Sequence, residues 1–237
     1  MSNNYFQFKQ FRVVQNHAAM RVGTDGVLLG AWAEAEKATT ILDIGTGTGV
    51  IALMLAQRSN AQIDAIDIEE GAIKDAGFNF NQSPWAERMT VVHCSIQEYV
   101  GQTAKLYDCI VSNPPFFSNS LKSKQMEKSL ARHTDTLSFE ELIDGVAKLL
   151  KHTGRFCVIL PIEAKIEMIT IASKFKLYPS RITQVKPNPL KPVKRVLIKF
   201  QFESLNLKED ELIIETETRH TYTSGFIQFV KAFYLNL

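Results

Sequence analysis

Short apolar runs alternate with stretches of helical periodicity over residues 40–200. Bounded apolar runs indicate strands, and apolar residues three and four positions apart indicate helices. The predicted strands cover 41–44, 63–68, 89–93, 109–111, 156–160, 193–202 and 211–214, and the predicted helices cover 50–57, 70–79, 139–150, 163–175 and 225–235. Strands that alternate with helices of this length pair in parallel through right-handed crossovers. The pattern therefore predicts an α/β fold, an open, doubly wound, mostly parallel seven-stranded sheet with helices on both faces.

The connections between these elements point to one edge of the sheet. The turn His152-Thr153-Gly154 is expected to end the helix over 139–150, with Gly154 as its C-terminal cap. The loops over 117–138 and 186–194 are notable, because a long loop in a compact domain usually serves a function or is disordered. Ligands bind to sheets of this class at the carboxyl ends of the strands. Residues at those ends are therefore the first candidates for chemistry.

Composition and charge indicate the compartment and the general class of the protein, but they do not identify its function. Apolar residues make up 45% of the 237 residues and charged residues 22%, as in ordinary globular proteins. The formal net charge of +2 permits an anionic partner without requiring one. Three scattered cysteines without a CxxC pair favour buried free thiols over a zinc site or a disulfide framework. Because no signal-peptide core or membrane-length apolar run is present, we expect a cytoplasmic protein without membrane contacts or a bound metal.

A glycine cluster follows the first predicted strand, in the sequence Asp43-Ile44-Gly45-Thr46-Gly47-Thr48-Gly49. Glycine lets the backbone turn tightly and approach a ligand closely, because no Cβ intervenes. The dinucleotide fingerprint needs its third glycine or alanine three residues after the second, and Val50 occupies that position. A pyrophosphate on the following helix is therefore disfavoured, and so is a nicotinamide dehydrogenase.

Asp67 ends the second predicted strand, twenty residues after Gly47. A carboxylate at that strand end can accept hydrogen bonds from both ribose hydroxyls of an adenosine. The alternative is an acid that caps the next helix, because Asp67 and Glu69 both precede it. The glycine cluster beside it favours the ribose interpretation.

The sequence Asn113-Pro114-Pro115-Phe116 at the end of the fourth predicted strand is the most specific motif in the chain. Consecutive prolines remove two backbone donors and fix φ, so the chain cannot rejoin a strand ladder. The Asn113 side-chain oxygen and the Pro114 carbonyl then form two rigid acceptors for an NH₂ group, and Phe116 provides a flat face for a base. An ordinary strand-ending turn is the alternative, since Asn-Pro is common in turns.

Two such acceptors suit methyl transfer to an aromatic amine. The lone pair of that amine is delocalised into the ring, and pulling both hydrogens out of the ring plane would direct it toward a sulfonium methyl group. Positioning and fixed dipoles would then supply most of the catalysis, without a charged general base.

The glycine cluster and the Asn-Pro-Pro-Phe motif together resemble those of class I methyltransferases that modify exocyclic or amide nitrogens. A closer resemblance is carried by residues 20–32 (MRVGTDGVLLGAW), 81–88 (NQSPWAER) and 232–235 (AFYL). These segments are similar to those of the bacterial valine-tRNA adenine-N6 methyltransferases, which methylate the adenosine just 3′ of the anticodon. The resemblance runs from about Phe8 to the C-terminus and covers nearly the whole chain.

The resemblance implies S-adenosylmethionine as the cofactor and tRNA as the partner, with no obligate protein partner. The chain departs from the wider class at Ser95, where that class usually has an acid that accepts a hydrogen bond from the adenine amine of the cofactor. A hydroxyl can also accept this hydrogen bond, but more weakly than a carboxylate. The expected cofactor-binding residues are Gly23, Thr24, Asp43, Gly45, Gly47, Asp67, Ser95 and Asn113, and the expected catalytic residues are Asn113, Pro114 and Phe116.

Basic residues form two groups that are suited to RNA phosphates, each contact steepening the salt dependence of binding. A solvated surface loop is the alternative for the second group. The first group is Lys122, Lys124, Lys128 and Arg132, and the second is Lys191, Lys194 and Arg195.

We therefore expect one domain over residues 1–237, with 1–39 as an N-terminal extension packed on the cofactor end of the sheet. The expected activity is methylation of adenine N6 in tRNA, at the adenosine next to the anticodon of a valine tRNA. Methylation of guanine N2 in ribosomal RNA or of a protein glutamine amide remains open. A non-enzymatic RNA-binding module is the alternative from another class.

Overall fold

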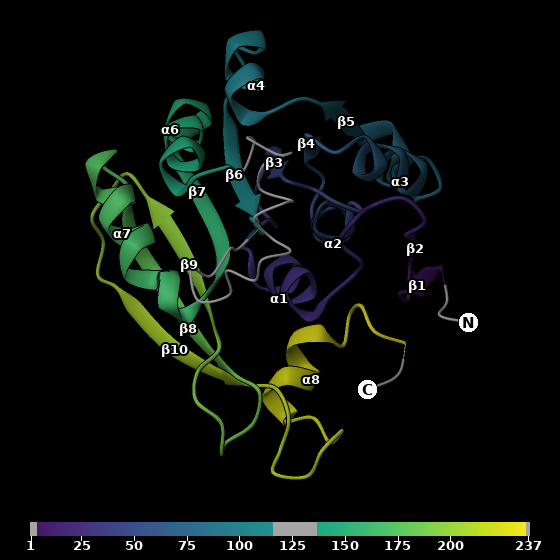
Figure 1. The fold of residues 1–237 in the computed structure, drawn as a ribbon, viewed down its shortest axis with the longest axis vertical. Helices are drawn as coiled ribbons and strands as arrows, with labels where there is room; N and C mark the ends of the chain where they lie inside the picture. The colour runs from purple at the N-terminus through teal and green to yellow at the C-terminus, as the bar shows by residue number, and fades with distance from the viewer. Residues whose placement is uncertain (1–3, 116–136, 236–237) are drawn as a thin grey trace, which may run out of the picture.

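The structure, a computed structural model, describes residues 4–115 and 137–235 (Figure 1). The elements before residue 115 are β1 (Tyr5–Gln7), β2 (Arg12–Val14), α1 (Thr24–Trp32), β3 (Thr40–Ile44), α2 (Val50–Arg58), β4 (Gln62–Asp67), α3 (Glu70–Asn81), the 3-10 helix η1 (Ala86–Arg88), β5 (Met89–His93), α4 (Ile96–Gln102) and β6 (Tyr107–Ser112). Those after residue 137 are α6 (Phe139–Leu149), β7 (Leu150–Pro161), the 3-10 helix η2 (Ile162–Ala164), α7 (Lys165–Lys174), β8 (Tyr178–Lys186), β9 (Arg195–Gln201), β10 (Lys208–Ile213) and α8 (Ser224–Val230).

The central sheet of the described chain has eight strands in the order β10-β8-β9-β7-β6-β3-β4-β5. Strand β9 is antiparallel to β7 and β8, and all other neighbouring pairs are parallel. The predicted doubly wound, mostly parallel α/β sheet is confirmed, with eight strands where seven were expected. The additional strand is β8, in which Arg181, Thr183 and Gln184 interrupt the apolar pattern. Thr183 is nevertheless buried, because its hydroxyl accepts a hydrogen bond from the Trp32 indole at 2.7 Å.

Helices cover both faces of this sheet (Figure 1). Helices α1, α2, α3 and α8 pack on one face, around a core that includes Leu29 and Leu53. Helices α4, α6 and α7 pack on the other, around Leu142 and Met168. The sheet thus separates two apolar cores. The helices do not cover its carboxyl edge, where the turns that follow the parallel strands lie.

The sequence pattern does not predict helices α1 and α4, for different reasons. Helix α1 is buried on every side from Gly26 to Trp32, so it lacks the polar face that produces helical periodicity. Helix α4 has only seven residues and is fixed by a capping box between Ser95 and Glu98. The final helix ends at Val230, earlier than expected, and Tyr234 instead forms an isolated bridge with Phe8.

The turn expected at residues 152–154 is wrong, because β7 begins directly after α6 and runs through it. Gly154 is buried within the strand rather than capping the helix. A Cβ on this residue would lie 2.8 Å from the Lys151 carbonyl oxygen and 2.9 Å from that of Tyr107. Glycine is therefore required for the close approach of β7 to β6, whose register shifts between Tyr107 and Cys109.

No helix within residues 4–115 or 137–235 combines the length and the apolar character needed to cross a membrane.

Replacement of Gly154 by alanine tests this close approach. The new Cβ meets two backbone oxygens that cannot move independently, so Gly154→Ala should lower the free energy of unfolding by about 1–3 kcal/mol, as overpacking does. Chemical denaturation measures the change. Gly101→Ala is the matched control, because Gly101 is an exposed residue of α4 and a Cβ there meets nothing within 4 Å. Equal stability of the two variants would contradict the packing argument.

Candidate functional site

The glycine cluster forms the turn between β3 and α2 at the carboxyl edge of the sheet. Gly45, Gly47 and Gly49 have φ values of +71°, +55° and +81°, in the left-handed region that favours glycine. A Cβ on Gly49 would lie 2.5 Å from the Phe80 ring, whereas one on Gly45 or Gly47 would meet no described atom within 4 Å. Gly49 therefore serves packing, and the backbone at Gly45 and Gly47 is open to a ligand.

The Asp67 carboxylate, at the end of β4, braces this turn. Its Oδ2 accepts a hydrogen bond from the Gly47 N–H at 2.8 Å, and its Oδ1 accepts one from the Glu69 N–H at 2.9 Å. Helix α3 has Glu69 at its N-cap, so the alternative role of Asp67 as the capping residue does not hold. A carboxylate oxygen has a further lone pair, and both oxygens of Asp67 can still accept from ligand hydroxyls.

Asp43, near the end of β3, is a fully buried carboxyl group. The Thr46 hydroxyl donates to its Oδ2 at 2.7 Å, while its Oδ1 has no hydrogen-bond partner among the described residues. Burial raises the pKa of Asp43 to about 7, the Thr46 hydrogen bond opposes the rise, and the charge of Asp67 adds to it. Asp43 is thus a buried acceptor whose charge changes near neutral pH.

Asn113 emerges from the sheet beside the glycine turn. Ile44 pairs with Ser112 in the parallel register of β3 and β6, and the Ser112 hydroxyl donates to the Ile44 carbonyl at 2.9 Å. Gly45 and Asn113 are therefore the next residues on adjacent strands, which lie about 4.8 Å apart in any sheet. The Asn113 side chain is half-buried, and no described residue forms a hydrogen bond with it. An amide side chain thus leaves the sheet next to the open glycine turn.

Pro114 is buried and Pro115 is exposed, so the chain turns away from the sheet immediately after Asn113. Phe116 lies outside the described residues, and its expected stacking role stays a prediction. The basic group of Lys122, Lys124, Lys128 and Arg132 lies outside them as well.

Helix α1 begins at the same edge, with Gly23 at its N-cap and Thr24 as its first residue. Asp25 accepts a charge-assisted hydrogen bond from Arg195 Nε at 2.8 Å, which ties the start of α1 to the start of β9. Arg195 is therefore paired with a protein carboxylate rather than being a free cation. Lys191 and Lys194 are exposed, and no described residue pairs with the amino group of Lys194.

Ser95 follows β5 and is held in the capping box of α4. Its hydroxyl accepts from the Glu98 N–H at 3.2 Å and donates to the Glu98 carboxylate at 2.9 Å. The Ser95 N–H also donates to that carboxylate, at 2.8 Å. The hydroxyl is thus already engaged in local structure and retains one acceptor lone pair.

Sequence reasoning missed the polar contacts that attach the N-terminal segment to the site. The Asn79 side chain accepts from the Val14 N–H at 2.8 Å and donates to the carbonyls of Val14 and Thr48 at 2.8 and 2.9 Å. Since Thr48 belongs to the glycine turn, Asn79 joins the N-terminal segment to that turn. The signal in the sequence is a polar residue on the apolar face of α3.

Asp75, one turn earlier in α3, holds the same segment. It accepts from the N–H groups of His17 and Ala18 at 2.8 and 2.9 Å, and it also pairs with the His17 ring at 2.9 Å. Burial alone would raise the pKa of Asp75, but these hydrogen bonds outweigh burial and lower it. Gly71 permits the approach, because a Cβ there would lie 2.5 Å from the His17 carbonyl oxygen.

Within the described ranges, no group of three or more His, Cys, Asp or Glu side chains is arranged to hold a metal ion. Cys94, Cys109 and Cys157 are all buried free thiols.

Comparison with known proteins places this arrangement among the methyltransferases. The family model described as the methyltransferase small domain matches residues 14–180. A solved structure of a predicted O-methyltransferase from Agrobacterium tumefaciens shares the fold with a TM-score of 0.71 at 18% identity, covering 88% of this chain and 96% of that one. A ribosomal protein L11 methylase from Lactobacillus delbrueckii aligns with a TM-score of 0.56 at 13% identity, covering 80% and 84%. The class I methyltransferase fold expected from the sequence is therefore confirmed, and it implies use of S-adenosylmethionine.

Full-length relatives give a narrower assignment. The tRNA1(Val) (adenine(37)-N6)-methyltransferase of Flavobacterium psychrophilum is 46% identical over 234 residues, covering 98% of this chain and all of the relative. That of Bacteroides fragilis is 47% identical over 238 residues, covering both chains completely. At such identity over the whole length, the resemblance seen in the sequence is confirmed, and the chain belongs to the tRNA1(Val) (adenine(37)-N6)-methyltransferase family.

Proposed function

We propose that this protein transfers the methyl group of S-adenosylmethionine to N6 of an adenine in tRNA, namely adenosine 37 next to the anticodon of a valine tRNA. The observation that carries the proposal is the placement of Asn113 beside Gly45 by the register of β3 and β6. The names of the full-length relatives support the same substrate. tRNA is a cytoplasmic molecule in bacteria, so we place the reaction in the cytoplasm.

The residues at the carboxyl edge fit this cofactor. S-adenosylmethionine supplies an electrophilic methyl group on a sulfonium. Gly45 and Gly47 offer backbone that no side chain covers, and Asp67 has acceptor capacity left for two ribose hydroxyls. Asp43 is fully buried beneath the turn and would support it through Thr46, while Gly23 and Thr24 at the start of α1 would border the methionine end.

Asn113 and Pro114 would hold the acceptor amine. The Asn113 Oδ1 and the Pro114 carbonyl accept its two hydrogens, which localises the nitrogen lone pair out of the ring plane. Both acceptors are neutral and rigid, so they stabilise the positive charge that develops on nitrogen. The methylated nitrogen is acidic once its lone pair has formed the new bond, and it would release one of its two protons to water without a general base. Phe116 is proposed to stack on the base and to fix its plane.

A loop adenosine suits this site energetically. Bases in an anticodon loop are already partly unstacked, so drawing one into a pocket costs less than the few kcal/mol typical of a paired base. Phosphate contacts from Lys194, Lys191 and the basic residues over 122–132 are proposed to hold the RNA. Arg195 is paired with Asp25, so an RNA phosphate would have to share the guanidinium group with that carboxylate.

Labelled methyl transfer to a valine tRNA transcript, followed by nucleoside mass spectrometry, tests the function. The wild-type protein should yield N6-methyladenosine at position 37. Asn113→Ala should reduce transfer by about 10²–10³-fold while leaving cofactor binding nearly unchanged, because it removes a fixed dipole from the developing charge. Asn60→Ala, at an exposed residue, is the matched control.

Each other outcome of that experiment identifies an alternative. Label in guanine of ribosomal RNA or in a protein glutamine amide would replace the proposed substrate. RNA binding without any methyl transfer would support the alternative that the protein is a non-enzymatic RNA-binding module. Full activity of Asn113→Ala would refute the acceptor role of that residue.

Removal of the Asp67 carboxylate tests the ribose contact. Each hydrogen bond to a charged group contributes about 1.5–3 kcal/mol, so Asp67→Ala should weaken cofactor binding by about tenfold or more in calorimetric titration. Asp67→Asn retains one acceptor oxygen, so its affinity for the cofactor should lie between those of the wild type and Asp67→Ala. Asp144→Asn, at a partly exposed residue of α6, should bind as the wild type does. A dissociation constant unaffected by Asp67→Ala would rule the contact out.

The raised pKa of Asp43 predicts a pH-dependent stability. Because the folded protein holds this proton more tightly than the unfolded chain, the stabilisation is complete below the ordinary pKa of 3.8 and is lost as the pH rises through about 7. Asp43→Asn cannot ionise. Its free energy of unfolding relative to the wild type should therefore increase from pH 5 to pH 8 in thermal or chemical denaturation, and a difference that stays constant would argue against the buried charge.

A further inference from the structure

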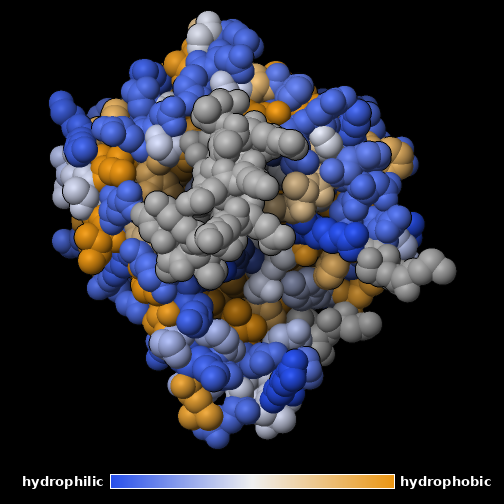
Figure 2. Space-filling view, in the orientation of Figure 1, coloured by the Kyte–Doolittle hydropathy of each residue, from blue (hydrophilic) through white to orange (hydrophobic). Residues whose placement is uncertain are grey.

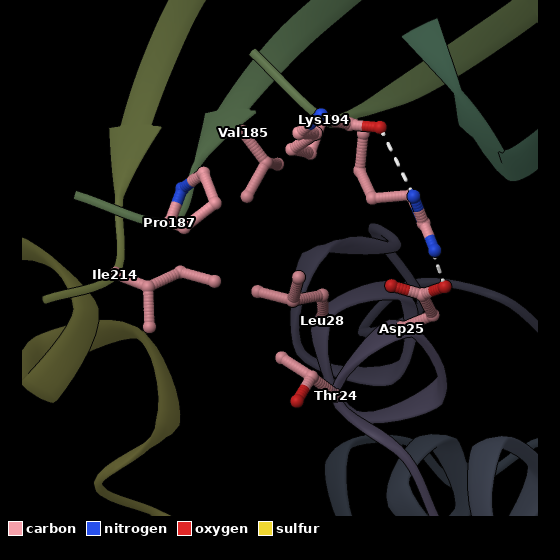
Figure 3. Close-up of a pocket in the computed structure, with 8 residues that line it drawn as sticks. Thr24, Asp25, Leu28, Val185, Pro187, Lys194 and Ile214 are labelled. Carbon is pink, nitrogen blue, oxygen red and sulfur yellow. Dashed lines mark hydrogen bonds and ion pairs between the residues drawn. The ribbon is translucent and has the colours of Figure 1, made fainter. Parts of the chain in front are cut away.

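A trough runs along the carboxyl edge of the sheet beyond the cofactor site. It consists of two cavities of about 320 and 290 Å³, which share Thr24, Pro187 and Ile214 as lining residues. Leu28, Val185, Pro187 and Ile214 point toward one another across the first cavity (Figure 3). In Figure 2 an apolar hollow bordered by polar residues is visible on this side of the molecule. Each cavity is about as large as the smaller pockets that hold ligands.

The two ends of the trough differ in charge. Lys194 and Arg195 line one end, where Arg195 is bound to Asp25 and Lys194 is exposed. Glu215 and Tyr222 line the other end, and the Glu215 carboxylate accepts from the His220 N–H at 3.3 Å. An anionic group is therefore favoured at the Lys194 end and disfavoured at the Glu215 end.

Aromatic side chains gather at the second end. Tyr222 and Phe226 pack with their ring centroids 5.0 Å apart, and Tyr234 also lines this cavity. Tyr222 is half-buried, and Phe226 supports it from the core. Burial raises the pKa of Tyr234 to about 12, so its hydroxyl stays protonated and can donate. An aromatic wall with hydrogen-bonding groups beside an amino group is the arrangement by which proteins hold unstacked bases of single-stranded RNA.

The cationic end is continuous with the proposed acceptor site. Arg195 pairs with Pro161, the last residue of β7, and the Lys194 carbonyl accepts from the Ile162 N–H at 3.3 Å. Strand β7 is the neighbour of β6, which leads into Asn113. Thr24, next to Gly23, lines both cavities. The trough therefore begins near the end of the strand adjacent to Asn113 and leads away from it.

We propose that this trough binds a nucleotide adjacent to the target adenosine, with its phosphate at Lys194 and its base against the apolar walls toward Tyr222. The proposal rests on the proposed function, since it requires an RNA substrate. It adds a second subsite on the RNA and assigns a specificity role to β8, β10 and the segment before α8. A base that fills the trough would fix the position of the RNA strand on one side of the methylated adenosine.

Kinetics with an anticodon stem-loop RNA test the phosphate contact. Lys194→Gln should raise the KM for RNA by about tenfold, leave kcat nearly unchanged, and reduce the slope of log KM against log salt concentration by about one. Lys208→Gln is the matched control, because Lys208 is an exposed lysine at the opposite end of β10. Equal KM values and equal salt slopes in the two variants would overturn the phosphate contact.

Abasic substrates test the base contact. An abasic nucleotide is placed in turn on each side of the target adenosine, and one of the two should raise the KM of the wild type by about tenfold. Tyr222→Ala should raise the KM for intact RNA and remove the penalty of that abasic site, so that the two changes are not additive. Tyr222→Phe keeps the ring and should behave as the wild type does, as should Tyr178→Ala at the amino end of β8.

The controls separate the possible failures. Cofactor titration of each variant shows that it is folded. If the wild type methylates no tRNA, the proposed function fails and the trough proposal fails with it. If the wild type methylates adenosine 37 but the abasic penalty persists in Tyr222→Ala, only the trough proposal is overturned.

Discussion

The parallel register of β3 and β6 determines how the site is assembled. Ile44 and Ser112 are paired, so both chains leave the sheet at the same level. The glycine turn then exposes backbone at Gly45, while the prolines after Asn113 prevent the chain from rejoining the ladder. The open backbone at Gly45 and the Asn113 residue are brought together by sheet geometry alone. Groups whose positions are set by the sheet in this way meet the condition under which positioning contributes most to catalysis.

Three aspartates near this edge have different roles because their environments differ. Asp43 is buried with one free oxygen, and burial raises its pKa to about 7. Asp67 is partly exposed and braces the glycine turn through backbone N–H groups. Asp75 accepts three hydrogen bonds from the N-terminal segment, which lower its pKa despite burial. Solvation and hydrogen bonding, rather than residue type, therefore decide which carboxyl group has a raised pKa, which braces the glycine turn and which holds the N-terminal segment.

The N-terminal segment is part of the site architecture because of helix α1. This helix is buried between α2, α8 and the sheet, and its first turn is bound to β9 through Asp25 and Arg195. Asn79 and Asp75 attach the preceding residues to α3. The chain before β3 thus contacts α3 beside the glycine turn at one point and β9 beside the trough at another.

The sequence by itself determined the alternation of strands and helices, the glycine turn, Asp67 at a strand end and the Asn113 motif, because each depends on local pattern and on residues with special backbone chemistry. It did not determine β8, whose polar residues are satisfied by partners such as Trp32, or α1, whose complete burial removes helical periodicity. The strand position of Gly154 and the pairing of Arg195 with Asp25 were likewise decided by tertiary structure. Such features depend on contacts between residues far apart in the chain, and neither periodicity nor a local motif records which distant group will satisfy a buried polar atom or leave no room for a Cβ.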